Sequence, residues 1–268
     1  MKISVVVIQT PGSDRHIPLT NLLVHDSRFN LIPLKATMLN SLDQLQFDSI
    51  PYNQAFFQFY ENRKMSFREI GCAKSHNDAR ILISEIYEGG VILEDDARIV
   101  NMDDFYNQSR QFLVSQENSL AVLSLTGFRG LSKKLVKSQK SHTLPLRGQP
   151  DLAVGYALTS LAASELVEAN SPITSVSDWP TSSCEFHATL EPPILHGDAS
   201  TMSVIDKTGN LRKGPSTLFK IESLLFISYL KKADLDINFK DYCERVFLRR
   251  LYWTIDLWRL KIKLIRRK

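Results

Sequence analysis

Short continuous hydrophobic runs alternate along the chain with longer, mixed segments. The first run, KISVVVI (residues 2–8), is rich in β-branched residues and ends in the turn sequence QTPGSDR, which is typical of a buried parallel strand. Similar runs predict strands at 29–37 (FNLIPLKAT), 91–99 (VILEDDARI), 120–127 (LAVLSLTG) and 152–160 (LAVGYALTS).

The segments between these runs have the spacing of amphipathic helices, at 14–25, from 66 to about 88, and at 161–170. Ser66 and Glu69 predict a capping box at the start of the long helix, and Gly89 with Gly90 predicts its end. Residues 40–65 are aromatic and loop-rich. Strands that alternate with helices indicate an α/β fold with a mainly parallel sheet flanked by helices.

The composition is that of an ordinary globular protein. Of 268 residues, 43% are hydrophobic and 23% are charged, and no apolar run approaches the roughly 20 residues of a membrane span. The three cysteines are far apart and lack the spacing of a zinc site, which favours a reduced, cytoplasmic setting.

The positive charge is concentrated at the C-terminus. Residues 249–268 hold eight Lys and Arg against one Asp, a net charge of +7, so the preceding 248 residues sum to −3 of the total +4. Apolar residues recur every three or four positions through 248–268, which predicts an amphipathic helix on an anionic membrane surface. The alternative is a terminal helix packed on the domain. The first 248 residues are net acidic and contain no nucleic-acid recognition motif, which argues against nucleic acid as a partner.

An acidic cluster, Glu94, Asp95 and Asp96, follows the hydrophobic run at 91–93. In a parallel sheet this end of the strand shares an edge with TPGSDR (10–15) and TGFRG (126–130), so three polar segments converge there. Strand alternation predicts Glu94 and Asp96 on one face and Asp95 on the other, unless the strand ends between them. Such carboxylates suit Mg²⁺ or Mn²⁺ beside substrate phosphates, although a solvated acidic turn is the alternative.

The stretch SFREIGCAKSHNDARILI, followed by GGVILEDDARI, resembles glycosyltransferase family 25, the lipooligosaccharide galactosyltransferase-like family. Members read approximately G-E-[IV]-G-C-x-x-S-H, then a helix, then L-E-D-D. The chain differs by Arg68 in place of a frequent glycine. The positions that match this motif are Glu69, Gly71, Cys72, Ser75, His76 and Leu93 to Asp96. Outside the motif, weaker likenesses occur in family order from residue 1 to about 205.

This resemblance implies a GT-A-like, Rossmann-type domain, placed at 1–218, with a helical basic extension at 219–268. It implies an inverting transfer of a hexose, commonly galactose from UDP-galactose, to a lipooligosaccharide or lipopolysaccharide acceptor, with Mn²⁺ or Mg²⁺ as cofactor. The enzyme would lie at the inner face of the bacterial inner membrane. Two rival functions are a metal-dependent phosphoryl hydrolase using the same acids and a catalytically inactive membrane-peripheral adaptor.

Residue roles follow from the same resemblance. Asp96 is the expected main metal ligand, and His196 could complete the site, although a surface-loop histidine is the alternative. The expected general base is Asp178, which has Trp179 beside it to stack a sugar and Glu185 in reserve. The residues expected to bind the metal are Asp96, Asp95 and His196, and those expected at the donor are Arg15, Ser75, His76, Glu94, Asp95 and Tyr156.

Several of these residues also have an ordinary structural interpretation. His76 and Tyr156 could be packed core residues, Arg15 a surface arginine, and Asp178 a turn aspartate before a proline. A further possibility for His76 is that it braces the acidic loop rather than touching the donor. Lys74 and Arg80 are expected to be solvated on the other faces of the helix.

Overall fold

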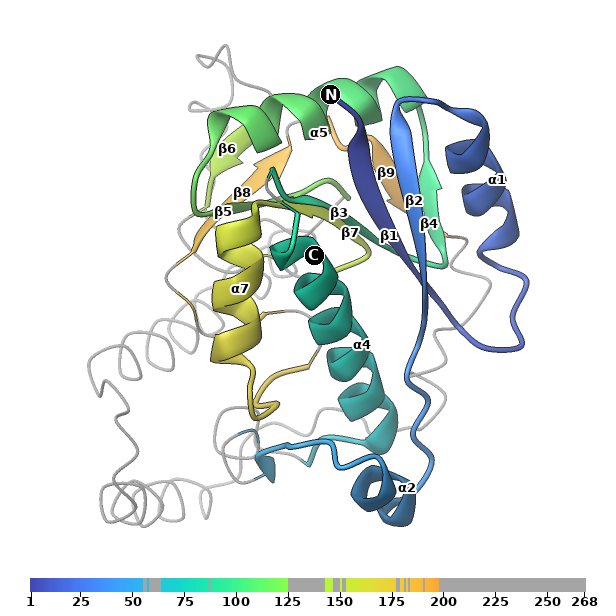
Figure 1. Cartoon of the computed structure of the whole chain (residues 1–268), viewed down its shortest axis with the longest axis vertical. Helices are drawn as coiled ribbons and strands as arrows, with labels where there is room; N and C mark the ends of the chain where they lie inside the picture. The colour runs from blue at the N-terminus through green and yellow to red at the C-terminus, as the bar shows by residue number, and fades with distance from the viewer. Residues whose placement is uncertain are drawn as a thin grey trace, which may run out of the picture. The chain divides into compact units, whose positions relative to one another are not determined.

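The computed structural model contains a central sheet covered by helices on both faces (Figure 1). It describes residues 1–54, 57, 64–86, 88–124, 143–146, 150, 153–176, 179–180, 182, 184–189 and 191–197. The expected domain boundary at 218 and the basic helix at 248–268 lie outside these ranges. Within them, no helix has both the length and the apolar character needed to cross a bilayer.

The sheet has seven strands in the order β2-β1-β3-β7-β5-β8-β6. Strands β1 (Ile3–Gln9), β2 (Phe29–Lys35), β3 (Gly90–Glu94), β5 (Ser119–Val122) and β8 (Glu185–Thr189) run in one direction. β7 (Gly155–Leu158) and β6 (Thr143–Pro145) run in the other. The expected α/β fold with a mostly parallel sheet is therefore confirmed, and β7 and β6 make it mixed.

Alternation along the strands divides the core into two layers. Val5, Val7, Val91 and Leu93 face the helices α1 (Ile17–His25) and α5 (Met102–Ser115). The intervening side chains face α4 (Phe67–Ser84) and α7 (Ser160–Ala169), which pack side by side (Figure 1). A residue's position in a strand therefore decides which pair of helices it meets.

The observed elements differ from the predicted ones at the functional edge and in the aromatic region. The strand expected at 91–99 ends at Glu94, and after a turn at Asp95 and Asp96 the chain resumes as β4 (Ala97–Ile99). β4 pairs with β9 (Ile194–His196), a strand that the sequence pattern missed. The aromatic region expected to be loop contains the short helix α2 (Leu42–Phe47). Both β4 and β9 have only three residues, too few to show a period.

The long helix α4 has the predicted N-terminus. The Ser66 side chain accepts from the Glu69 N–H at 3.3 Å, and the Glu69 carboxylate accepts from the Ser66 N–H at 2.9 Å. Close packing fixes the helix further, because a Cβ on Gly71 would lie 2.5 Å from the Thr37 carbonyl oxygen. The helix is thus held in place before its second and third turns deliver Cys72 and His76 towards the end of β3.

Candidate active site

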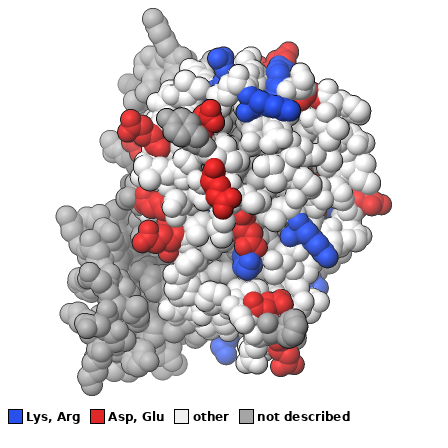
Figure 2. Space-filling model, viewed as in Figure 1, with Lys and Arg blue, Asp and Glu red and all other residues white. Residues whose placement is uncertain are grey.

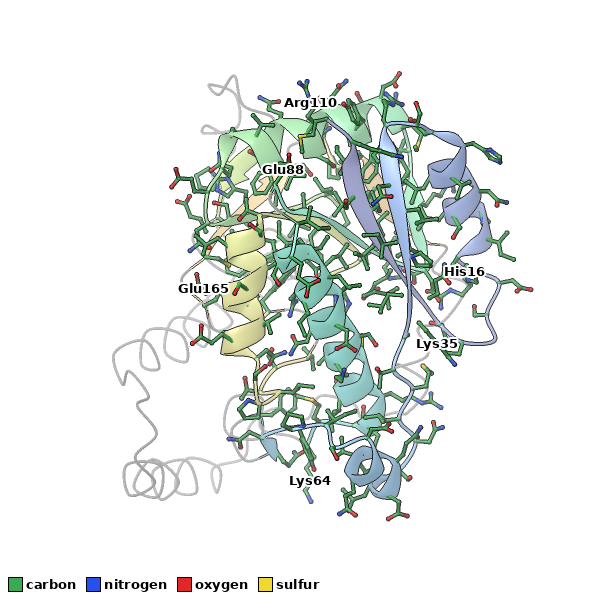
Figure 3. The ribbon with its side chains drawn as sticks, viewed as in Figure 1. His16, Lys35, Lys64, Glu88, Arg110 and Glu165 are labelled. Atoms are coloured by element: carbon green, nitrogen blue, oxygen red, sulfur yellow. The ribbon has the colours of Figure 1, made fainter. Side chains whose placement is uncertain are left out.

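The candidate site lies where the parallel strands end. Figure 3 labels His16 and Lys35, which mark this edge beside the ends of β1 and β2. The loop after β1 supplies Arg15, and the turn after β3 supplies Asp95 and Asp96. The expected convergence of segment 10–15 with the acidic cluster is therefore present. The third expected segment, 126–130, lies outside the described residues.

Arg15 balances the two aspartates. Its Nη2 lies 3.2 Å from Asp95 Oδ1 and also forms an ion pair with Asp96 Oδ2. The Thr10 backbone N–H donates to Asp95 Oδ2 at 3.2 Å. These contacts explain how adjacent carboxylates tolerate one another, because a guanidinium and a backbone dipole offset their repulsion.

His196 reaches the same cluster through the β4–β9 ribbon. The register pairs Ala97 with His196, which places the imidazole Nε2 3.7 Å from Asp96 Oδ2. A Cβ on Gly197 would lie 2.7 Å from the Asp96 carbonyl oxygen, so the two segments approach closely. Residues a hundred positions apart thus share one small site, as the expected metal set of Asp95, Asp96 and His196 requires.

Glu94 points to the opposite face of the sheet, towards α4. His76 Nε2 lies 3.0 Å from Glu94 Oε1, and His76 Nδ1 lies 3.0 Å from the Tyr156 hydroxyl. An ionised carboxylate only accepts hydrogen bonds, so Nε2–H donates to Glu94 and Nδ1 accepts from Tyr156. The hydrogen-bond network therefore assigns the tautomer and fixes the direction of the Glu94 side chain.

A buried arginine supports this network from behind. Arg80 is fully buried, and its guanidinium hydrogen-bonds to the Tyr156 hydroxyl and lies 5.7 Å from the Trp179 ring. The expectation that Arg80 is solvated is wrong. It lies four residues after His76 and three before Ile83, and this spacing places it on the buried face of the helix.

Burial and neighbouring charges shift several pKa values in the site. Burial and then the charge of Glu94 raise the pKa of Asp96, while His196 and Arg15 oppose that rise. Burial lowers the pKa of His76, which keeps the imidazole neutral. Burial opposes ionisation of Glu94, but the hydrogen bond from His76 and the neighbouring positive charges, Arg15 among them, together outweigh it, and the pKa of Glu94 is lowered. Burial raises the pKa of Tyr156 to about 12, so its hydroxyl stays protonated.

The structure buries several of the residues predicted to bind the donor. Tyr156 and His76 are buried, and they brace Glu94. Ser75 is also buried, and its hydroxyl accepts from the Thr37 N–H and donates to the Gly71 carbonyl. Trp179 packs edge-on against Tyr156 with ring centroids 5.0 Å apart, so it belongs to the core rather than to a sugar-stacking surface.

The structure describes only one of the two residues expected to act as the general base. Asp178 lies outside the described residues. Glu185 begins β8, and the register sets it level with Ser119, at the start of β5 rather than at its end. Because β3 and β5 share the partner Leu158 at Gly90 and Leu120, Glu185 lies at the edge opposite Glu94, five residues or roughly 16 Å away along the strands. The site therefore does not bring Glu185 together with the acidic cluster.

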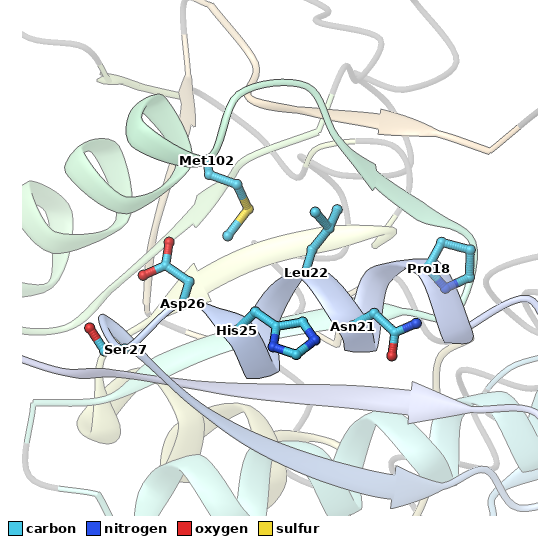
Figure 4. A pocket seen from close by; sticks show the side chains of 7 residues that line it. All are labelled: Pro18, Asn21, Leu22, His25, Asp26, Ser27 and Met102. Carbon is cyan, nitrogen blue, oxygen red and sulfur yellow. The ribbon is translucent and has the colours of Figure 1, made fainter.

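Two surface features lie outside the site. An open groove of about 660 Å³ runs along the outer side of α1 (Figure 4), and it contains none of the predicted site residues. On the face shown in Figure 2, acidic and basic side chains are interspersed. This face of the described chain lacks the single-sign field typical of nucleic-acid binding.

The acidic edge fits a divalent cation. Asp96 Oδ1 is buried and has no hydrogen-bond partner within the described part of the chain. A buried carboxylate oxygen without a partner is costly, and a bound cation would satisfy it. Asp96, Asp95 and His196 together offer oxygen and nitrogen ligands of the kind that Mn²⁺ accepts.

Comparison with known proteins decides the family. The model of glycosyltransferase family 25, described as an LPS biosynthesis protein, matches residues 24–181, more than half of the chain. The chain belongs to glycosyltransferase family 25. The protein is therefore a glycosyltransferase of lipopolysaccharide biosynthesis. The match contains His76, Tyr156 and the acidic cluster, whereas Arg15 and His196 lie beyond its ends. A search of curated proteins finds no match.

The hydrogen bonds that join Tyr156, His76 and Glu94 in this family-25 transferase should contribute to its stability. We expect Tyr156→Phe to lower the free energy of unfolding by about 1 to 3 kcal/mol, because His76 Nδ1 loses its hydrogen-bond donor inside the core. The measurement is urea denaturation of both proteins. Tyr106→Phe is the matched control, because the Tyr106 hydroxyl donates to a carbonyl at an exposed position and its loss should cost little. Equal stability of Tyr156→Phe and wild type would contradict the assigned hydrogen bond.

Proposed function

We propose that the protein transfers a hexose, with inversion, from a nucleotide sugar of the UDP-galactose type to a lipooligosaccharide or lipopolysaccharide acceptor, using Mn²⁺ or Mg²⁺. The observation that carries this proposal is the meeting of Arg15, Asp95, Asp96 and His196 at the edge where the parallel strands end. In α/β folds this is the edge where nucleotides bind. Family membership supplies the reaction class, and the donor and acceptor are part of the proposal.

In this proposal the residues at the acidic edge have separate roles. Asp96, with Asp95 and His196, would hold the cation, whose chemistry is to neutralise the diphosphate leaving group and to orient it. Glu94, held by His76, can accept hydrogen bonds from hydroxyls of the donor. Arg15 would exchange its aspartate contacts for a donor phosphate, since a guanidinium binds either anion.

Inversion by direct displacement requires a base that takes the proton of the acceptor hydroxyl. Asp178 is the residue that we propose as this base, from the sequence.

We also propose that residues 248–268 bind an anionic membrane, where a lipid-linked acceptor would be found. Removal of residues 249–268 should then abolish flotation with anionic liposomes, and unchanged flotation would refute this part.

A thermal-shift screen tests the donor and cation together. UDP-, GDP- and CMP-sugars are added to the purified full chain with and without Mn²⁺. We expect the largest stabilisation from a UDP-hexose with Mn²⁺, because a ligand that binds only the folded state raises its stability. Stabilisation by UDP-hexose that persists unchanged in EDTA would contradict the cation, and release of inorganic phosphate in place of UDP would favour a hydrolase.

A further inference from the structure

A second group of ligand atoms lies on the α4 side of the acidic edge. The Cys72 thiol, a ring nitrogen of His76 and a carboxylate oxygen of Glu94 all lie within 4.8 Å of one another. Atoms that share one zinc ion are typically separated by less than this, because each lies about 2.0 to 2.3 Å from the metal. A small closure of the three side chains would therefore allow one cation to contact them all.

The local structure brings these three residues together for simple reasons. Cys72 and His76 are four residues apart on α4, so their side chains lie on one face of the helix. Glu94 ends β3 and turns towards that face, where it meets His76. Cys72 and Glu94 are partly exposed, which gives a cation a route from solvent, while His76 closes the inner side.

His76 is oriented as metal-bound histidines are. One ring nitrogen faces the Glu94 carboxylate, and the other is held by the Tyr156 hydroxyl, which Arg80 contacts in turn. A second partner that fixes the ring is a regular feature of histidine ligands. A tyrosine hydroxyl can donate or accept, so Tyr156 can serve the ring whichever nitrogen carries the proton.

We propose that Cys72, His76 and Glu94 form a binding site for a borderline-soft transition metal of the Zn²⁺ class, distinct from the hard-cation site at Asp96. Sulfur, nitrogen and oxygen ligands from three residues, with a water in the fourth position, form a common zinc arrangement. Binding releases the Cys72 thiol proton to solvent, and the imidazole proton moves from Nε2 to Nδ1, which then donates a hydrogen bond to the Tyr156 oxygen.

Occupation of this site has a consequence for the acidic cluster. Glu94 would be drawn into coordination and lost to the donor, so Zn²⁺ would inhibit transfer even when Mn²⁺ is present. This consequence rests on the proposed function, whereas binding of the metal does not. The two parts are therefore measured separately.

Cobalt is the probe for binding, because Co²⁺ coordinated by a thiolate shows a charge-transfer absorption in the near ultraviolet. The test protein is the full chain carrying Cys184→Ser and Cys243→Ser, in which Cys72 is the sole cysteine. Its matched control is the same protein with Cys72→Ser added, which has no cysteine. Thermal melting verifies that both are folded.

We expect one equivalent of Co²⁺ to produce the absorption in the Cys72-only protein and none in Cys72→Ser, with Zn²⁺ displacing the cobalt. Glu94→Gln, added to the Cys72-only protein, should weaken cobalt binding at least tenfold. Absence of the band in the Cys72-only protein, or its presence in Cys72→Ser, would overturn the site.

Zinc sensitivity tests the consequence. UDP release is measured at saturating Mn²⁺ with increasing Zn²⁺, each protein being compared with its own zinc-free rate. We expect inhibition of the wild type and at least tenfold less sensitivity in Cys72→Ser. Equal sensitivity of both proteins would refute inhibition through this site. A protein that binds cobalt through Cys72 but releases no UDP would instead contradict the proposed function.

Discussion

We expect Asp96→Asn to lower kcat/KM for sugar transfer by about 100-fold or more, because even residues that only support a metal ligand contribute 10- to 100-fold. Asp96 is the centre of the acidic edge, since it contacts Arg15, lies near His196 and has a buried oxygen without a hydrogen-bond partner among the described residues. An amide of the same size keeps the shape but removes the charge that a cation and Arg15 need. The measurement is UDP release with a Mn²⁺ titration.

Asp103→Asn is the matched control. Asp103 is exposed and pairs with Arg28 at 2.7 Å on the surface, so the same chemical change there should leave the rate within about twofold of wild type. Wild-type rates for Asp96→Asn, or full wild-type activity in EDTA, would contradict the assignment of Asp96 to the cation.

Stability measurements separate the loss of function from unfolding. The pKa of Asp96 is raised, chiefly by burial, so its ionised form costs stability in the folded protein at neutral pH. That cost disappears as the pH falls through the folded-state pKa and the carboxyl becomes protonated. In EDTA at pH 7 we therefore expect Asp96→Asn to melt higher than wild type, with a difference that shrinks at acidic pH. Lower stability of the variant at pH 7 would show that the ion pair with Arg15 outweighs burial.

We expect Gly89→Ala to lower the free energy of unfolding by about 2 to 5 kcal/mol, the largest stability effect of our predictions. Gly89 joins α4 to β3 with a φ of +88°, a left-handed conformation that an L side chain adopts at a cost. An added Cβ would also lie 2.3 Å from the Leu158 carbonyl oxygen and 2.7 Å from the Thr159 Cα. Backbone atoms cannot rotate away as a side chain would, so β3 or β7 must shift.

Gly12→Ala separates the two contributions. Gly12 also has a positive φ, +73°, but a Cβ there would meet no atom within 4 Å. Gly12→Ala should therefore lower the free energy of unfolding only by the conformational cost, about 1 to 2 kcal/mol. Urea denaturation of both variants provides the comparison. Equal losses would show that the contact with β7 is relieved without cost, and the close approach would then not be a constraint on the fold.

Much of the fold follows from local sequence patterns. Runs of β-branched and other apolar residues form the strands β1, β2, β3, β5 and β7. The capping box at Ser66 and Glu69 is formed as these residues predict. The direction of β7 was not available from its own residues. A strand buried on both faces has the same composition in either orientation, and only its neighbours decide.

The candidate site was partly predictable. The position of Asp95 and Asp96 at a strand end, with Arg15 after another strand, follows from the rule that parallel strands end at one edge. The sequence could not place Glu185, because the direction and register of β8 depend on pairing with β5. The spacing of Arg80 from His76 and Ile83 sets it on the buried face of the helix, but a charged residue is ordinarily solvated, and the aromatic partners that accept it there come from distant segments.

The sequence by itself determined the family, the order of most elements and the acidic cluster at the end of β3, because these depend on contiguous residues. Tertiary structure decided the division of labour within the cluster. Termination of β3 at Glu94 directs that residue to His76 on α4, while Asp95 and Asp96 turn to Arg15. His196 joins them only through the β4–β9 pairing. Each of these partners is remote in sequence, and packing alone brings them into contact.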